Sequence, residues 1–208
     1  MNATRRLLAS TALLLAPLSL AACQTEVPED QRTATSLPAP TNSTGATLPA
    51  ASGAHNAADA MFAEMMRVHH EQALTLSDLV LAKDGIDPRV RTLAEQIKGA
   101  QGPEIDQMRG WLAGWGIQPG SLGDHSAHME GMVSEADLDR LKAADAGQGQ
   151  RLFLEFMIAH HEGAVTMAQD QLRMGVNGQA KDLSGVIIGA QKKEIAQMRG
   201  LLKELPAA

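Results

Sequence analysis

The chain has 208 residues, with 18 lysines and arginines against 24 aspartates and glutamates and a formal net charge of −6. An acidic chain without a run of basic residues has no surface suited to a phosphate backbone, so we exclude a nucleic-acid partner. The single cysteine excludes both an internal disulfide and a thiolate metal cluster.

The N-terminus has the plan of a secretory signal peptide. Arg5 and Arg6 precede an apolar run over residues 7–20, which is too short to span a membrane. The closing letters "LAAC" resemble the lipobox of bacterial lipoproteins, which implies a lipidated N-terminus at Cys23. By resemblance to lipoprotein sorting in two-membrane bacteria, Gln24 at the next position implies the outer membrane. We therefore expect a periplasm-facing lipoprotein held on the membrane by its lipid; an ordinary signal peptide with an incidental cysteine is the alternative.

Residues 1–22 are the predicted signal peptide, and residues 23–56 are the lipidated cysteine and a disordered tether. The tether is rich in Pro, Thr, Ser and Ala and has almost no large apolar residues, so it cannot bury enough surface to fold. Residues 57–208 are enough for one domain with its own core. Removing the signal takes away two arginines, which leaves 16 basic and 24 acidic residues and a formal charge of −8.

Composition favours helices, because Ala, Leu, Met, Glu and Gln are abundant while tyrosine is absent. Apolar residues recur at helical spacing from Ala57 to Lys83, and Gly85 and Pro88 end this run. A second helix is predicted from Pro88 to Trp115, with an irregularity near residues 99–103. The letters "GIQPGSLGD" that follow predict a loop.

Three further helices complete the predicted elements. Ser134 followed by Asp137 resembles a capping box, which predicts a short helix to about Ala144. Two long helices are predicted over residues 147–174 and 178–205, because the apolar residues again recur at helical spacing and Pro206 fits a stop.

The chain contains one helical pattern twice. His69-His70 matches His160-His161 at an offset of 91, whereas "GAQGPEIDQMRGWL" matches "GAQKKEIAQMRGLL" at an offset of 90. Each repeat is therefore a helical hairpin with the histidine pair on its first helix. A hairpin alone cannot cover its apolar stripe, so we predict an all-α four-helix bundle of two repeated hairpins, with the short helix in the connecting segment.

The paired Met-x-x-His-His-x-x-Ala phrases, each followed by Gln-x-x-Glu-Ile-x-Gln-Met, resemble the domain-of-unknown-function 305 family from about Met61 to Leu202. The resemblance implies a ferritin-like four-helix bundle in an exported bacterial protein. Some relatives are associated with copper handling in the periplasm, which implies copper here. The letters "HMEGMVSEADLDRL" are also similar to the Gly-Met loop of the family. Phe156 departs from the repeat, because the first copy has Met65 there, so two identical sites are not expected.

In each repeat a methionine lies one helical turn before a histidine, since residues three and four apart share a face. Met66 precedes His70 in this way and Met157 precedes His161, while Met65 precedes the other histidine of the first copy. The two histidines of a pair are about 100° apart around the helix. At least one of each pair is therefore expected at a helix interface or a half-open edge.

Thioether and neutral imidazole donors suit Cu(I), and Ag(I) by the same softness, better than they suit Mg, Ca or Mn. Methionine binds without losing a proton, so such a site works where free thiols are oxidised. The loop "HSAHMEGM" adds further donors in a segment that could close over an ion. The predicted metal ligands are Met65, Met66, His69, His70, Met157, His160 and His161 on the first helices, Met108 and Met198 on the second helices, and His125, His128, Met129 and Met132 in the loop.

Each of these residues also has a structural interpretation. Methionine at helical spacing usually fills a core, which is the favoured interpretation of Met108 and Met198. The loop donors can be part of a solvated turn. The histidines can form a polar layer in which each ring is hydrogen-bonded, and four glutamates are near enough in sequence to serve, namely Glu64, Glu71, Glu155 and Glu162.

A di-iron enzyme of the ferritin-like kind requires the pattern Glu-x-x-His, which the sequence lacks. The sequence also has no phosphate-binding glycine loop and no serine nucleophile elbow, so we do not expect an enzyme. The predicted function is a Cu(I) buffer or chaperone that exchanges copper with a donor or acceptor protein. The alternative is a metal-free, lipid-anchored helical module that docks an envelope partner, with the histidines as packing or a pH-sensitive polar layer.

Overall fold

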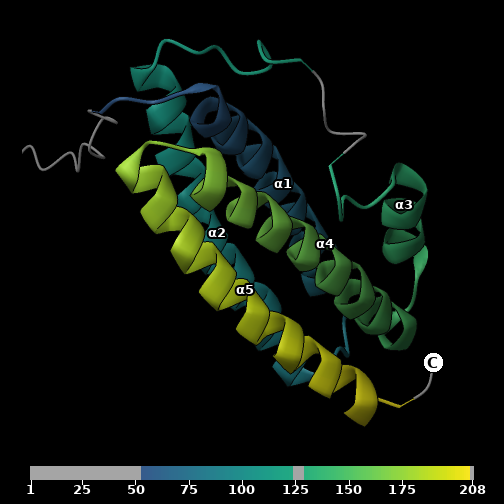
Figure 1. The fold of residues 1–208 in the computed structure, drawn as a ribbon. Helices are drawn as coiled ribbons and strands as arrows, with labels where there is room; N and C mark the ends of the chain where they lie inside the picture. The colour runs from purple at the N-terminus through teal and green to yellow at the C-terminus, as the bar shows by residue number, and fades with distance from the viewer. Residues whose placement is uncertain (1–52, 124–128, 207–208) are drawn as a thin grey trace, which may run out of the picture. The chain divides into compact units, whose positions relative to one another are not determined.

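The computed structural model describes residues 53–123 and 129–206, and the described residues form five helices and no strand (Figure 1). Helix α1 spans Ala57–Leu81, α2 Pro88–Gly114, α3 Glu135–Ala143, α4 Ala146–Met174 and α5 Gly178–Glu204. All five predicted helices are confirmed, with ends within two residues of the prediction. The predicted signal peptide and most of the tether lie outside the described residues.

Each helix begins at a side chain that caps its free N–H groups. At α1, Asn56 and Asp59 form a reciprocal capping box. The side chains of Asp87, Ser134, Asp145 and Asn177 cap the four later helices. The cap at Ser134 confirms the predicted start of the short helix.

Helix α2 runs through Pro103 without a break, so the predicted irregularity near residues 99–103 is wrong. Pro103 and Gly99 both lie on the exposed face, where water can bond the carbonyl that the proline leaves without a donor. Ile97 and Ile105 are buried on either side of the proline, and their packing holds the helix in place.

The helices pack as two antiparallel hairpins. Helix α1 pairs with α2, α4 pairs with α5, and α1 lies against α4 to join the hairpins, as Figure 1 shows. The short helix α3 packs on α1 and α4. Buried apolar residues of all four long helices form two clusters, which we name by their largest aromatic residues: the Phe153 cluster and the Trp111 cluster. This is the predicted four-helix bundle of repeated hairpins.

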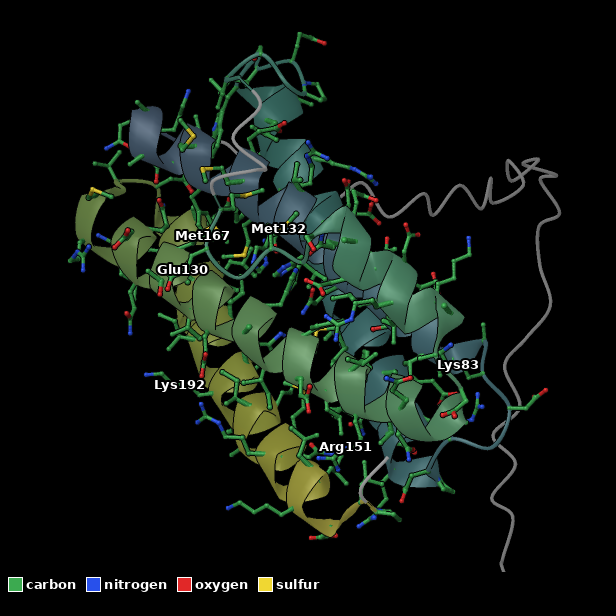
Figure 2. The ribbon with its side chains drawn as sticks, turned by 90° about the vertical axis from the view of Figure 1, so that its right-hand side faces the viewer. Lys83, Glu130, Met132, Arg151, Met167 and Lys192 are labelled. Carbon is green, nitrogen blue, oxygen red and sulfur yellow. The ribbon has the colours of Figure 1, made fainter. Side chains whose placement is uncertain are left out.

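Polar contacts fasten the two hairpins at their ends. The buried carboxylate of Asp59 in α1 accepts hydrogen bonds from the backbone N–H groups of Val176 and Asn177, in the turn between α4 and α5. At the other end, the ammonium group of Lys83 donates to the carbonyl oxygen of Ala144 at 2.6 Å (Figure 2). None of the helices in the described ranges combines the length and apolar character that a membrane span needs.

Candidate metal centre

A layer of polar residues separates the two apolar clusters, and all four long helices contribute to it. We call this set the histidine layer: His69 and His70 of α1, Gln101 and Glu104 of α2, His160 and His161 of α4, and Gln191 and Glu194 of α5. The four histidines are all 0% exposed. Of the two places expected for at least one histidine of each pair, the structure shows the helix interface and not the half-open edge, because His69 of α1 and His160 of α4 lie against each other.

His69 and His160 face each other across the contact between α1 and α4. Their ring centroids are 3.6 Å apart, with an angle of 34° between the ring planes. One ring comes from each hairpin, so the two repeats meet at this pair of imidazoles. The ring of His161 lies further away, 6.3 Å from His160 between centroids.

The other histidine of each pair contacts a carboxylate on the second helix of its own hairpin. The Nε2 atom of His70 lies 2.8 Å from the Glu104 carboxylate, and that of His161 lies 2.7 Å from Glu194. An ionised carboxylate only accepts hydrogen bonds, so both rings carry their proton on Nε2. In a neutral ring, Nδ1 is then left with a free lone pair.

These two carboxylates were not among the predicted site residues, and Glu64, Glu71, Glu155 and Glu162 were the wrong candidates as histidine partners. A signal was present in the sequence, because Glu104 and Glu194 occupy the same place in the repeated "EIxQM" phrase. Gln101 and Gln191 of the repeated "GAQ" letters were missed in the same way, although both are 3% exposed.

Five of the eight ring nitrogens of the four histidines have no hydrogen-bond partner among the described residues. His69 donates from Nε2 to the carbonyl oxygen of Glu130 at 3.3 Å. Within the described residues, no hydrogen-bond partner reaches Nδ1 of His69, His70 or His161, or either ring nitrogen of His160. One of the two His160 nitrogens carries the proton of the neutral ring, so four buried nitrogens in one layer are free to accept a proton, a hydrogen bond from water or a metal ion.

The surroundings keep these rings neutral. Burial, together with the neighbouring His70, lowers the pKa of His69 to about 3. Burial and the nearby His69 hold the pKa of His160 well below its ordinary value. Burial also lowers the pKa of His161, although the carboxylate of Glu194 opposes this shift. Neutral imidazole is the form that binds a metal.

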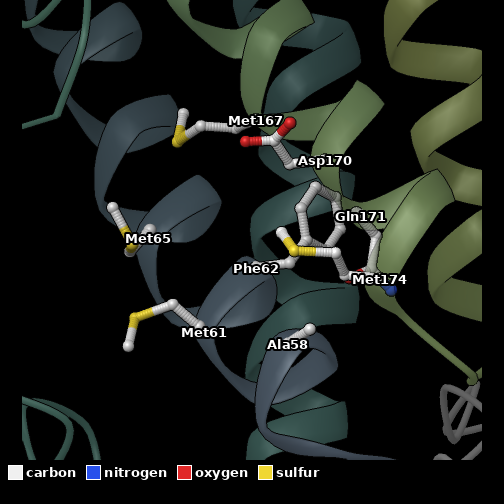
Figure 3. A pocket seen from close by; sticks show the side chains of 8 residues that line it. All are labelled: Ala58, Met61, Phe62, Met65, Met167, Asp170, Gln171 and Met174. Carbon is white, nitrogen blue, oxygen red and sulfur yellow. The ribbon is translucent and has the colours of Figure 1, made fainter.

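Four of the predicted methionines border the histidine layer. Met66 and Met108 belong to the Trp111 cluster, whereas Met157 and Met198 belong to the Phe153 cluster, and all four are 0% exposed. Met65 is different, since it is half-buried and lines a separate surface pocket (Figure 3). His125, His128 and Cys23 lie outside the described residues.

The end of the predicted loop lies over the layer. The backbone of Glu130 and Gly131 is so close to α4 that a β-carbon on Gly163 would lie 1.9 Å from the Glu130 carbonyl oxygen. Gly131 has a φ of +82°, which suits glycine. The Gln72 amide both donates to and accepts from the backbone of Val133, at 2.9 and 2.8 Å. Met129 is buried and Met132 half-buried on this segment, which carries the Glu130 and Met132 labels in Figure 2.

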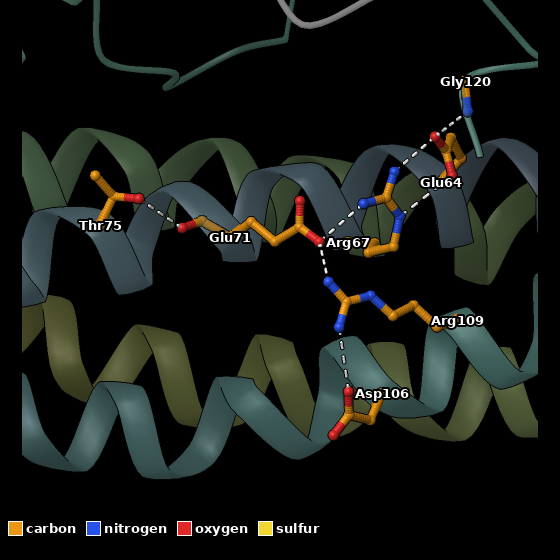
Figure 4. Close-up of polar contacts among 7 residues, drawn as sticks. All are labelled: Glu64, Arg67, Glu71, Thr75, Asp106, Arg109 and Gly120. Carbon is orange, nitrogen blue, oxygen red and sulfur yellow. Dashed lines mark hydrogen bonds and ion pairs between the residues drawn. The ribbon is translucent and has the colours of Figure 1, made fainter.

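Three of the four glutamates expected beside the histidines, Glu64, Glu71 and Glu162, bond to arginines instead. Arg67 donates to Glu64 at 2.7 Å and to Glu71 at 2.8 Å, and Glu71 also accepts from Arg109 of α2 (Figure 4). The second repeat has a matching pair, in which Arg199 donates to Glu162. These networks hold each hairpin together on its outer side and leave the buried rings to Glu104 and Glu194.

The layer differs from a zinc site. Within residues 53–123 and 129–206, no three side chains of His, Cys, Asp or Glu converge as ligands of one ion. A tetrahedral zinc site needs three or four such ligands. An ion held in this layer would instead use the facing rings of His69 and His160, with thioethers as its further donors.

Comparisons with known proteins agree with the helical-bundle fold. The family described as "Domain of unknown function (DUF305)" matches residues 59–202. A DUF305 fragment from Deinococcus radiodurans is 34% identical, with a TM-score of 0.67 over 74% of this chain and 100% of that one. A DUF305 protein from Streptomyces coelicolor is 33% identical, with a TM-score of 0.65 over 71% and 93% of the two chains.

A third similar structure is that of CopM in its Cu(I)-bound form, which is 29% identical, with a TM-score of 0.59 over 72% of this chain and 98% of that one. CopM has also been solved in silver-bound, Cu(II)-bound and apo forms. A comparison with curated proteins finds no match. Since the family match covers more than half of the sequence, the chain belongs to the DUF305 family, as its doubled motif predicted.

Proposed function

We propose that the chain binds Cu(I), and Ag(I) by the same softness, in the histidine layer, and acts as a copper buffer or chaperone. The observation that carries this proposal is the set of buried, unpaired ring nitrogens on His69, His70, His160 and His161. Leaving a buried acceptor without a partner costs about 1 to 3 kcal/mol. A bound metal ion would give these unpaired nitrogens a partner and so would explain why several of them lie in one layer.

The hydrogen bonds of the rings support a metal site. A metal-binding histidine usually donates its second ring N–H to a carboxylate or a carbonyl, which fixes the orientation of the ring. His70 and His161 have such carboxylates in Glu104 and Glu194, and His69 has the Glu130 carbonyl. These second partners leave Nδ1 of each ring as the donor to an ion.

The donor types favour a soft, monovalent ion. His69 and His160 supply facing neutral imidazoles, and Met66 and Met157 lie one helical turn before the histidine pairs. Imidazole with thioether prefers Cu(I) to a hard cation. Met108 and Met198 border the layer and are supplementary donors. The copper-bound and silver-bound structures of the similar protein CopM support the same metal class.

Binding, and not catalysis, is the proposed activity. All four rings are fully buried between helices, so an ion held there has no open side at which a substrate could bind. The Glu104 side chain is 16% exposed and lines an open cavity of about 410 Å³ between α2 and α5. The Glu104 side of the histidine layer therefore offers a route by which copper could be exchanged with a donor or acceptor protein.

We further propose that the protein works in the cell envelope, anchored through Cys23. The support is the signal-like N-terminus with its lipobox pattern. Cys23→Ser should move the protein from the membrane fraction to a soluble or unprocessed form, as measured by fractionation and mass. An unchanged distribution of the variant between the fractions would contradict a lipid anchor.

A Cu(I) titration of the full-length protein against a chromogenic Cu(I) chelator tests the binding site. We expect His69→Leu with His160→Leu to lose the tightly bound Cu(I) while circular dichroism stays helical, because these rings have few partners to lose. The control is His55→Ala, which removes an exposed histidine that stacks on Trp115 outside the layer and should leave copper binding intact.

Two results would contradict the proposal. If the double variant folds and binds as much Cu(I) as the parent, the layer is not the site. If the parent itself takes no Cu(I) from the chelator, the protein is a metal-free helical module.

A further inference from the structure

A second group of sulfur donors lies outside the histidine layer. A surface pocket of about 180 Å³ opens between the start of α1 and the end of α4. Four of its lining residues are methionines, namely Met61, Met65, Met167 and Met174. Figure 3 shows Met61 and Met65 extending from α1, and Met167 extending from α4 toward the side where Met65 lies. We call this the methionine pocket.

None of these four methionines is fully buried, although Met167 also packs against the Trp111 cluster. Met174 is 56% exposed, and the other three are partly exposed, whereas Met66 at the next position in α1 is fully buried. Methionine is among the residues most often found buried, so a group of four at one surface is unusual. Their long, unbranched side chains can turn their sulfur atoms toward one point without moving the backbone.

The pocket lining contains one acidic side chain and no basic one. The acidic side chain is Asp170, and Arg173 forms an ion pair with it from outside the lining. Gln171 is only 2% exposed and also lines the pocket. Its Oε1 atom is buried and has no hydrogen-bond partner among the described residues. A buried, unpaired acceptor beside a carboxylate and four thioethers suits a cation.

We propose that the methionine pocket is a second binding site for a soft monovalent cation, Cu(I) or Ag(I), held by thioethers of both α1 and α4. Thioether sulfur selects Cu(I) over hard divalent ions. The site is separate from the histidine layer, since its lining residues include no histidine. Met65 therefore belongs to this pocket and not to the site beside His69 that its spacing predicted.

Silver binding to the full-length protein tests the proposal, since Ag(I) needs no reductant. The protein is labelled with ¹³C at the methionine methyl groups, and silver nitrate is added to two equivalents. We expect the methyl signals of Met61, Met65, Met167 and Met174 to shift, and dialysis to retain one silver ion per chain that is lost in a variant with all four changed to leucine. Leucine conserves the volume, so helix content should be unchanged.

Three further variants test whether the silver binding is specific to the pocket. Met61→Leu with Met167→Leu is the milder variant if the fourfold change does not fold, and it should lose the same ion. Leu172→Met adds an exposed methionine to α4 outside the pocket and should bind no additional silver. His69→Leu with His160→Leu should keep the shifts of the pocket methyl groups.

The outcomes separate this site from the function proposed above. Loss of silver in the pocket variants but not in the histidine variant supports the pocket, even if the histidine layer binds nothing. Loss only in the histidine variant, with unshifted pocket methyl signals, would overturn the pocket and leave the layer intact. Additional silver bound by Leu172→Met, beyond the amount bound by the parent, would also overturn it, because any exposed methionine would then suffice.

Discussion

At the scale of single residues, the proposed metal site depends most on His160. Its ring is fully buried, and neither of its nitrogens has a partner within the described residues. Its neighbour His161 is equally buried but bonds Glu194 at 2.7 Å. A ring placed for stability alone would resemble His161, because an unpaired buried polar group weakens the fold. The unpaired His160 ring therefore supports the proposed metal site.

The histidine layer should make the apo protein sensitive to mild acid. Since burial lowers the pKa values of His69, His160 and His161, these rings take up protons mainly on unfolding. The contribution of these neutral rings to the free energy of unfolding is complete above the unfolded pKa of about 6.5. It is lost as the pH falls toward the folded pKa values, about 3 for His69. In that range, each ring lowers the free energy of unfolding by up to about 1.4 kcal/mol for every pH unit of acidification.

Urea denaturation from about pH 7 to pH 5 measures this effect, with a smaller decline expected for His69→Leu with His160→Leu. The lowered pKa values of Asp59 and Glu64 affect the stability in a different, more acidic pH range. For both carboxylates burial opposes the shift, but hydrogen bonds from Gln171 and Arg67 respectively outweigh it, and their contribution is lost only below about pH 4.5. A parent whose stability is flat between pH 7 and pH 5 would contradict neutral buried rings.

At the scale of elements, the contact between α4 and the segment over the layer depends on a missing side chain. Gly163→Ala would put a β-carbon 1.9 Å from the Glu130 carbonyl oxygen, so the segment must move away from the helix. Gly185→Ala is the matched control, because a β-carbon there meets nothing within 4 Å. Alanine should stabilise the control by about 0.5 to 1 kcal/mol, the ordinary helix preference.

We expect Gly163→Ala to lower the melting temperature and to speed hydrogen exchange at the Val133 amide, which bonds Gln72. The exchange rate reports on the segment itself, so it separates local displacement from general loss of stability. Equal stabilisation by both alanines, with Val133 still protected, would show that the segment does not rest on α4.

At the scale of the whole molecule, the helices and their pairing could be predicted from the sequence, whereas the partners of the histidines could not. Helical spacing and the doubled motif determine the two hairpins. Which residues of α2 and α5 face the rings depends on how each helix is rotated in the bundle, so Glu104 and Glu194 were missed. The internal repeat could have suggested these two glutamates, because they occupy equivalent positions in the repeated "EIxQM" sequence.

Two other features depend on long-range packing. Pro103 leaves α2 intact because the proline lies on the exposed face while its neighbours are buried, which a local rule for proline does not capture. Met65 and Met66 are adjacent in sequence, yet one lines a surface pocket and the other joins the core. Spacing along one helix could not separate these two roles without the position of α4.

The two hairpins each supply one ring to the facing pair, so an ion bound there would join the repeats at the centre of the bundle. Anomalous X-ray diffraction from crystals of the full-length protein grown with silver would locate the ion directly. We predict a silver peak in the histidine layer, within bonding distance of a ring nitrogen of His69 or His160 and of a methionine sulfur. Silver peaks confined to the protein surface, with none in the layer, would contradict a buried metal centre.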